Sequence, residues 1–402
     1  MSSLIRRATV SGFVAALGLT SLAACGNSSS SSGTGTGSTT EITAACSLDS
    51  PPTSGAKAPS GGGASGSASG KVGVIVPDTT SSTRYTQYDA PLLTSALKAA
   101  GITPDVQNAQ GDKNKFASIA QSMIGEGVKV LIIDSIDAAS GAGVEKAADA
   151  AGVKVIDYDR VNLGGTAPYY VSFDNEDVGK LQAQTMIDCL TKQGVTKPNI
   201  IMMDGGTDVD NNAVLFAKGA HEVLDPLVSA GKAVIAQEAV VKGWTVSNAA
   251  PAFTGALTAA GGKVDGVLAA NDDIANAVIS VLQQSGLQGH VVVTGQDASV
   301  DGMQNIITGK QSMTVFKDVK LEANAAAQLA IALIGGKDPS SAGLTLSPFE
   351  DPKAPQHKLQ ALLLPTNVIT QANVKDVVDA GALKQADICK GIESDCKKFG
   401  LG

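Results

Sequence analysis

From residue 71 onward, short apolar runs alternate with longer stretches in which apolar positions recur at helical spacing. The runs at 72–76, 130–133, 153–156 and 169–173 predict strands, and 85–100, 144–151 and 178–190 predict helices between them. A second series of apolar runs follows at 199–203, 232–236, 264–268 and 290–294. Continuous apolar strands that alternate with helices are typical of parallel sheets covered on both faces. The pattern therefore predicts an α/β fold with two doubly wound parallel-sheet lobes.

The first 70 residues follow a different pattern. Arg6 and Arg7 precede an uncharged, mostly apolar stretch at 8–22, which is the order found in export signals. Residues 22–25 resemble a bacterial lipobox, so we expect residues 1–24 to be a lipoprotein signal peptide. Cys25 would then carry a lipid that anchors the exported chain to the outer face of the cytoplasmic membrane. The alternative is a chance cysteine after an ordinary secretory signal.

Residues 25–70 are dominated by Ser, Gly and Thr. Such a composition cannot bury a core, and it predicts a flexible linker between the lipid anchor and the folded part.

The composition argues against some classes of partner. The chain has 402 residues with Lys+Arg 30, Asp+Glu 38 and a net charge of -8. Because nucleic-acid binding needs a basic surface, this balance argues against such a partner. No apolar run reaches the roughly 18 residues of a membrane-spanning helix.

Four cysteines remain if Cys25 is lipidated, and four cysteines allow three pairings. Cys389 and Cys396 would close a short loop, and we favour that bridge. Cys189 lies on an apolar helical face, where it is either a small buried residue or the partner of Cys46.

Polar residues follow nearly every predicted strand, at the edge where open parallel sheets bind ligands. These segments are 78–85, 134–135, 157–160, 173–175, 204–212, 242–244, 271–273 and 295–297. Because Asp and Asn also cap helices, capping is an equal alternative for Asp78, Asp134 and Asp174. Capping does not account for Arg160 or for Trp244, the single tryptophan of the chain.

Asp, Asn and Arg side chains offer paired hydrogen-bonding groups that suit the hydroxyls of a sugar, and a tryptophan face suits the C–H surface of its ring. The folded part has no phosphate-binding glycine loop, no G-x-S-x-G elbow and no H-E-x-x-H pair. Residues 208–219 begin like a calcium loop but lack its Gly and its Glu. The sequence therefore predicts an uncharged polyhydroxylated ligand, with no catalytic group, cofactor or metal.

Several motifs, taken in order, resemble the type I periplasmic sugar-binding receptors of ABC importers. The matching stretches are 158–160, 171–179, 205–216, 243–244, 271–272, 295–298 and 314–317. The chain is most similar to the xylose-binding receptors and also similar to the multiple-sugar-binding receptors. The resemblance implies a periplasmic-binding-protein-like fold with a hinge, and lobes formed by 71–174 with 318–345 and by 175–317 with 346–402.

The same resemblance implies a set of ligand contacts. They are Arg84, Tyr85, Asp159, Arg160, Asn212, Trp244, Asn271, Asp297 and Lys317. Three alternatives stay open: a helix-start salt bridge for Arg84, a structural pair for Asp159 and Arg160, and an ordinary surface position for Lys317.

The implied function is capture of a monosaccharide by hinge closure and its delivery to a membrane permease by a monomeric receptor, without chemical change. D-xylose is the first expectation, because residues 243–244 resemble the xylose type. Glucose, galactose and arabinose follow it, because the 78–85 loop is closer to the multiple-sugar receptors. A receptor that signals to a sensor kinase would have the same pocket. A repressor with this core would need a DNA-binding motif, and a Ser/Gly tether stands in its place.

Overall fold

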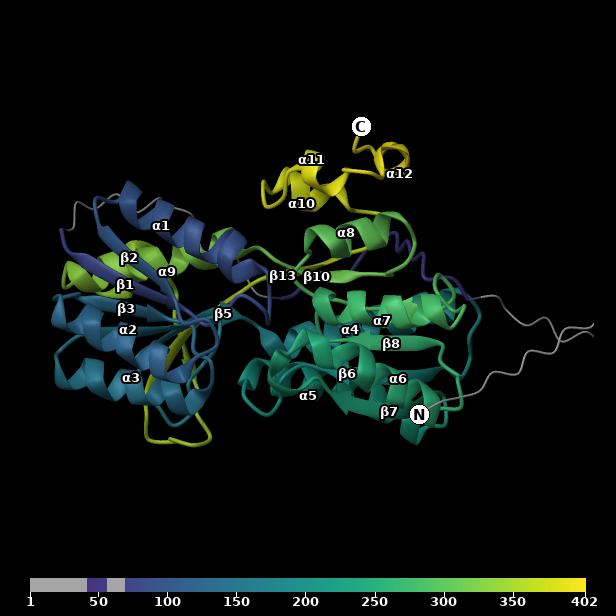
Figure 1. The fold of residues 1–402 in the computed structure, drawn as a ribbon, viewed down its shortest axis with the longest axis horizontal. Coiled ribbons are helices and arrows are strands. Elements are labelled where there is room, and N and C mark those ends of the chain that lie inside the picture. The colour runs from purple at the N-terminus through teal and green to yellow at the C-terminus, as the bar shows by residue number, and fades with distance from the viewer. Residues whose placement is uncertain (1–41, 56–68) are drawn as a thin grey trace, which may run out of the picture. The chain divides into compact units, whose positions relative to one another are not determined.

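Two separate sheets carry the predicted strands in a computed structural model that describes residues 42–55 and 69–402. The first lobe is built on a seven-stranded sheet with the order β11-β12-β5-β4-β3-β1-β2 (Figure 1). Its strands are β1 (Lys71–Val76), β2 (Thr103–Asn108), β3 (Val130–Ile133), β4 (Lys154–Tyr158), β5 (Tyr169–Phe173), β11 (Ser347–Phe349) and β12 (Leu359–Leu364). All neighbours are parallel except β11, which is antiparallel to β12.

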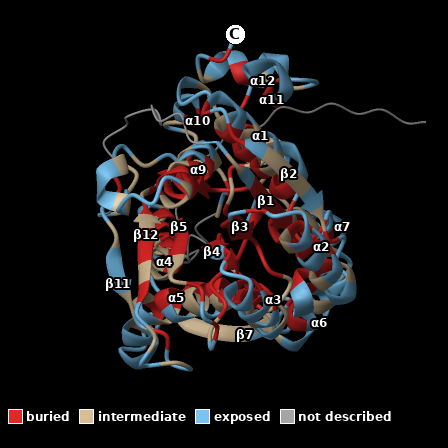
Figure 2. Ribbon diagram, turned by 90° about the vertical axis from the view of Figure 1, so that its left-hand side faces the viewer, coloured by how far each residue is buried: buried red, intermediate tan, exposed pale blue. Residues whose placement is uncertain are grey.

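Helices cover both faces of this sheet. One apolar cluster joins the strands to α1 (Ala90–Ala99) and α9 (Val319–Ile334), and another joins them to α2 (Lys113–Gly125) and α3 (Ala138–Ala150). The short turns η1 (Tyr85–Asp89) and η4 (Pro339–Ala342) belong to the same lobe. Figure 2 shows buried strands enclosed by helices whose outer faces are exposed.

The second lobe repeats this plan on a parallel sheet with the order β7-β6-β8-β9. Its elements are β6 (Asn199–Asp204), β7 (Val234–Val240), β8 (Gly266–Ala269), β9 (Val292–Val293), α4 (Asn175–Lys192), α5 (Asn211–Ser229), η2 (Lys242–Trp244), η3 (Val246–Asn248), α6 (Ala249–Ala259), α7 (Asp272–Gln284) and α8 (Val300–Ile307). Helices α4 and α5 cross in close contact, which position 179 allows because it is glycine. A Cβ there would lie 1.9 Å from the Phe216 carbonyl oxygen. The predicted α/β class with parallel sheets is confirmed.

Three crossings connect the lobes: β5 leads into α4, β10 (Thr314–Lys317) into α9, and β12 into β13 (Thr366–Ile369). Strands β10 and β13 pair antiparallel beside the crossings. The expected assignment of 346–402 to the second lobe is wrong for β11 and β12. Strand β12 pairs along its length with β5, so both strands extend the first sheet.

The sequence pattern also missed β2. Its residues Thr103–Asn108 contain one aliphatic side chain, because the strand lies at the sheet edge and buries little. Edge strands of this kind have no apolar run to mark them.

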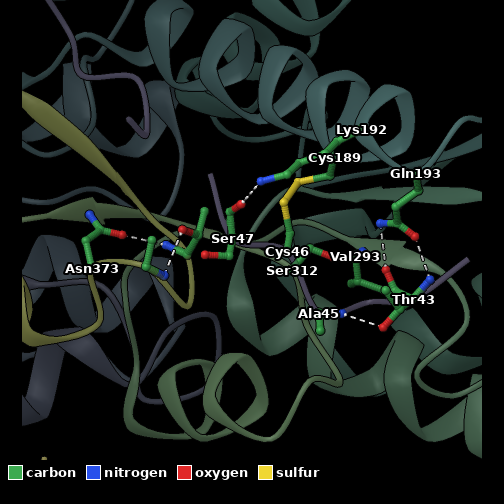
Figure 3. The surroundings of a disulfide bond; sticks show 12 residues. Thr43, Ala45, Cys46, Ser47, Cys189, Lys192, Gln193, Val293, Ser312 and Asn373 are labelled. Carbon is green, nitrogen blue, oxygen red and sulfur yellow. Dashed lines mark hydrogen bonds between the residues drawn. A yellow bond between two sulfur atoms is a disulfide. The ribbon is translucent and has the colours of Figure 1, made fainter. Parts of the chain in front are cut away.

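Residues 42–55, which we call the N-terminal strap, pack on the second lobe. Cys46 forms a disulfide with Cys189 of α4, and Lys192 Nζ donates to the Ser47 carbonyl oxygen at 2.6 Å (Figure 3). Farther along, Thr53 forms an antiparallel bridge with Asn367 of β13. The expectation of a flexible linker is therefore wrong for the strap, which a disulfide and a strand bridge hold in place. The expected signal peptide, Cys25 and the rest of the linker lie outside the described residues.

Residues 370–402 form a C-terminal module of three short helices, α10 (Lys375–Asp379), α11 (Gln385–Ile388) and α12 (Glu393–Lys398). A disulfide joins Cys389 and Cys396, as predicted. Among the described residues, no helix has both the length and the apolarity needed to cross a membrane.

Candidate ligand-binding site

A cavity lies at the carboxyl edges of the two sheets and takes its walls from both lobes. All nine residues predicted as ligand contacts line it: Arg84, Tyr85, Asp159, Arg160, Asn212, Trp244, Asn271, Asp297 and Lys317. Their contact with a ligand stays a prediction. The structure thus brings together residues as far apart in the sequence as Arg84 and Lys317, which are separated by 233 positions.

Sequence reasoning missed five further lining residues. They are Ser81, Ser82, Asp210, Phe216 and Gln296. Each lies within one helical turn of a predicted contact in the sequence, so a search of sequence neighbours would have found them. Asp210 lies in the polar segment 204–212 and in the calcium-like loop, but it is not among the predicted ligand contacts.

The first-lobe wall is centred on Arg84, whose guanidinium donates to three acidic side chains. Its Nε and Nη2 donate to the two oxygens of Asp89 at 3.0 and 2.8 Å, and Nη2 also donates to Glu322 Oε2 at 2.5 Å. Its Nη1 donates to Asp159 Oδ1 at 3.2 Å. The salt bridge considered as an alternative for Arg84 is present, and the ligand role stays a prediction. These bonds leave one of the five guanidinium N–H groups for a ligand.

Asp159 and Arg160 follow β4 at the bottom of this wall. Asp159 has a φ of 60°, and its Oδ2 accepts from the Tyr85 hydroxyl at 3.2 Å. Burial alone would raise the pKa of the Asp159 carboxyl, but the charges of Arg84, Lys317 and Arg160 hold that pKa below its usual value. Asp159 is therefore an ionised acceptor that faces the cavity.

Arg160 bonds to its surroundings rather than to Asp159. Its Nη2 donates to the Tyr85 hydroxyl at 2.9 Å, and its Nη1 donates to the Ser135 carbonyl oxygen at 3.2 Å. Its Nε lies 3.4 Å from Asp210 Oδ2 but makes no hydrogen bond within the described residues. Both arginines also lie over the Tyr85 ring, at 5.7 Å for Arg84 and 5.6 Å for Arg160. The Tyr85 ring is therefore in cation–π contact with both guanidinium groups.

The second-lobe wall includes Trp244. The indole Nε1 donates to Asp210 Oδ2 at 3.0 Å, and the ring meets Phe216 edge-on with centroids 6.3 Å apart. The Gly205 backbone lies against the indole, where a Cβ would come within 2.0 Å of the ring. These contacts fix the indole, as a stacking surface for a sugar requires.

The remaining polar groups of the second lobe have fewer partners. Asn271 caps α7 by accepting from the Ile274 amide at 2.9 Å, and its Nδ2 makes no hydrogen bond within the described residues. Asp297 accepts from Gln296 Nε2 at 3.0 Å and, across the lobes, from the Ser82 hydroxyl at 3.4 Å. Burial raises the pKa of the Asp297 carboxyl. Both side chains therefore retain capacity for a ligand.

Asn212 and Lys317 lie where the lobes meet. Asn212 Nδ2 donates to the Asp159 carbonyl oxygen at 2.8 Å, which links α5 of the second lobe to the first. Lys317 Nζ donates to Asn175 Oδ1 at 3.0 Å and lies 4.8 Å from the Phe216 ring centroid. Because Lys317 is buried, its pKa is lowered, and an ordinary surface position is excluded. Two of its ammonium protons remain for other acceptors.

Comparison with known proteins agrees with this geometry. Residues 72–338 match the family model described as periplasmic binding protein domain. The chain is 36% identical over 303 residues to the D-xylose-binding periplasmic protein of Escherichia coli (strain K12), covering 75% of this chain and 88% of that protein. It is 35% identical over 283 residues to the multiple sugar-binding periplasmic receptor ChvE of Rhizobium radiobacter, covering 67% of this chain and 79% of that protein.

A solved structure shares both the fold and part of the sequence. It is the carbohydrate transporter solute-binding protein of Chloroflexus aurantiacus in complex with D-glucose, with a TM-score of 0.70 and 29% identity. The match covers 79% of this chain and 97% of that one.

Proposed function

The chain belongs to the periplasmic binding protein domain family, as a sugar-binding receptor of the ABC-transport class, and from this premise we propose that it captures D-xylose in the cavity between its lobes. The observation that carries the proposal is the lining of that cavity. Carboxylate, amide and cationic side chains from both lobes line it together with one indole, which is the set of groups that binds a polar, uncharged ligand.

The two walls suit the two faces of a sugar. Asp159, Asp297 and Asn271 offer acceptors and a donor for neighbouring hydroxyls, and Lys317 adds donors at the crossing between lobes. Trp244 covers the apolar face of the ring. Because the ligand contacts both lobes, it stabilises the arrangement in which they enclose it, and closure of the hinge follows from binding.

A broad-specificity aldose receptor is the second candidate. It is favoured by the 35% identity to a multiple sugar-binding receptor and by a glucose-bound structural relative. Glucose differs from xylose by one hydroxymethyl group, and a pocket discriminates such a group mainly by steric exclusion. We keep xylose as the first proposal because residues 243–244 match the xylose type and an E. coli xylose-binding protein is a 36% relative.

The cellular setting is part of the same proposal. We infer that the receptor is exported, is held at the outer face of the cytoplasmic membrane through lipidated Cys25, and delivers its sugar as a monomer to an ABC permease. Metabolic labelling with a radioactive fatty acid tests the anchor. The chain should be labelled and the Cys25→Ser variant should not.

Titration calorimetry with xylose, glucose, galactose, arabinose and ribose tests the ligand. The purified protein should retain the N-terminal strap, because the strap is bonded to the second lobe. Tight binding of xylose alone supports the first proposal, and comparable binding of several aldoses supports the second. Binding of none of them contradicts both.

A further inference from the structure

The π-helical turn η1 faces three different parts of the molecule. Tyr85 lines the cavity, and Asp89 is buried against Arg84. Tyr88 has a different surrounding, because it is half-buried and packs against the apolar cluster that joins the C-terminal module to α8, β10 and β13. One turn of the first lobe therefore contacts both the cavity and this cluster.

The C-terminal module is part of the second lobe. Its cluster joins Val377, Ile388 and the cystine of Cys389 and Cys396 to side chains of α8, β10 and β13. Gln304 Nε2 of α8 also donates to the Ile388 and Lys390 carbonyl oxygens at 2.9 and 3.1 Å. Figure 1 shows the module lying over α8.

The packing of Tyr88 against this cluster therefore joins the two lobes outside the cavity. Figures 1 and 2 both place the module beside the start of α1, which continues directly from η1. Burial, and then the negative charge of Asp387 on α11, raise the pKa of the Tyr88 phenol, which agrees with close approach of the two elements. Neither Tyr88 nor any module residue lines the cavity.

We propose that Tyr88 and the C-terminal module form an interlobe clasp, which stabilises the arrangement that encloses the sugar. Tyr88 is then a positioning residue for ligand binding, and this role rests on the proposed function. On this proposal, a rotation that separates the cavity walls also separates η1 from the module. The free energy of the clasp favours the closed state whether or not a ligand is present.

Tyr88→Ala removes the ring that packs in the clasp and leaves every residue that lines the cavity unchanged. Burying half of a tyrosine side chain in the closed state shifts the equilibrium constant between the open and closed states by about fivefold. We expect D-xylose to bind about fivefold more weakly, through faster dissociation, while the ratio of affinities among sugars stays unchanged. Stopped-flow fluorescence and calorimetry measure these quantities. Tyr88→Phe keeps the packed ring and should behave as the wild type.

Gln87→Ala is the matched control, because Gln87 lies on the same turn and is exposed. Small-angle scattering without sugar provides a readout that does not depend on the ligand. Tyr88→Ala should have a larger radius of gyration than Gln87→Ala and the wild type. If the wild type binds no sugar, the proposed function fails, but the scattering comparison still tests the clasp.

Equal radii of gyration and equal dissociation rates in Tyr88→Ala and Gln87→Ala would overturn the proposal. Should Tyr88→Ala fail to fold, hydrogen exchange on the wild type decides. The amides of residues 385–388 should exchange more slowly with bound D-xylose than without it, and identical exchange rates reject the clasp.

Discussion

The two walls of the cavity have different internal chemistry. In the first lobe, the cationic side chain of Arg84 is bonded to Asp89, Asp159 and Glu322, so its charge is compensated before any ligand arrives. In the second lobe, Asn271 and Asp297 have fewer protein partners and retain hydrogen-bonding capacity. The first wall is therefore a rigid, preassembled platform, whereas the second wall completes its hydrogen bonds with the ligand.

This difference has an electrostatic origin. A buried cation needs anionic partners, because an uncompensated charge in a low-dielectric interior is strongly unfavourable. Arg84 and Asp89 are both buried, so each depends on the other. Neutral amides such as Asn271 carry no such penalty, and they can remain partly unpaired beside a cavity that water or a sugar enters. The first wall should thus control stability and the second wall affinity.

Asp89→Ala is the strongest test of the first wall. The change removes two hydrogen bonds from Arg84 and one from the Tyr158 hydroxyl, and it leaves a buried charge partly unpaired. We expect the free energy of unfolding to fall by about 3–5 kcal/mol in urea denaturation. Glu126→Ala is the control, since the exposed pair with Lys71 should contribute less than about 1 kcal/mol. A loss as small as that of the control would remove the distinction between the walls.

Asp297→Asn tests the second wall. The amide keeps the shape of the side chain but loses one acceptor for a sugar hydroxyl. We expect binding of D-xylose to weaken by about 2 kcal/mol or more, roughly thirtyfold, with little change in the urea midpoint. Asp301→Asn, an exposed position on α8, should bind as the wild type does. Unchanged affinity in Asp297→Asn, or a large loss of stability, would place Asp297 in a structural role.

The pH dependence of stability sharpens the same comparison. Burial raises the pKa of the Glu322 carboxyl to about 8, against the opposing effect of Arg84. The folded state thus holds this proton to higher pH than the unfolded state, which releases it near its ordinary pKa of about 4.3. The contribution to unfolding free energy therefore falls as pH rises from about 4.3 to 8, and it stays low above that range.

Glu322→Gln cannot titrate but keeps an acceptor for Arg84, so its unfolding free energy should vary less with pH over that interval. Urea denaturation at several pH values measures the slope. Glu126→Gln serves as the exposed control and should keep the wild-type slope. A slope in Glu322→Gln that equals the wild-type slope would mean that another group carries the pH dependence.

Much of the site followed from local pattern. Trp244, Asn271 and Asp297 were found because each comes shortly after a strand, and the carboxyl ends of parallel strands meet at one edge of a sheet. The partners of Arg84 were not found in the same way. Glu322 lies 238 residues away on α9, in a helix whose apolar pattern gives no sign of a cavity.

Local order along the chain thus determined the alternating elements, the two lobes and the residues at the strand ends, because hydrophobic periodicity and strand-end chemistry are properties of short segments. Tertiary structure alone decided which sheet β12 extends, where the strap is bonded and what Tyr88 contacts. Each of these contacts joins residues that are far apart in the sequence. Such contacts are selected by the burial of complementary surfaces, which no short window of sequence contains.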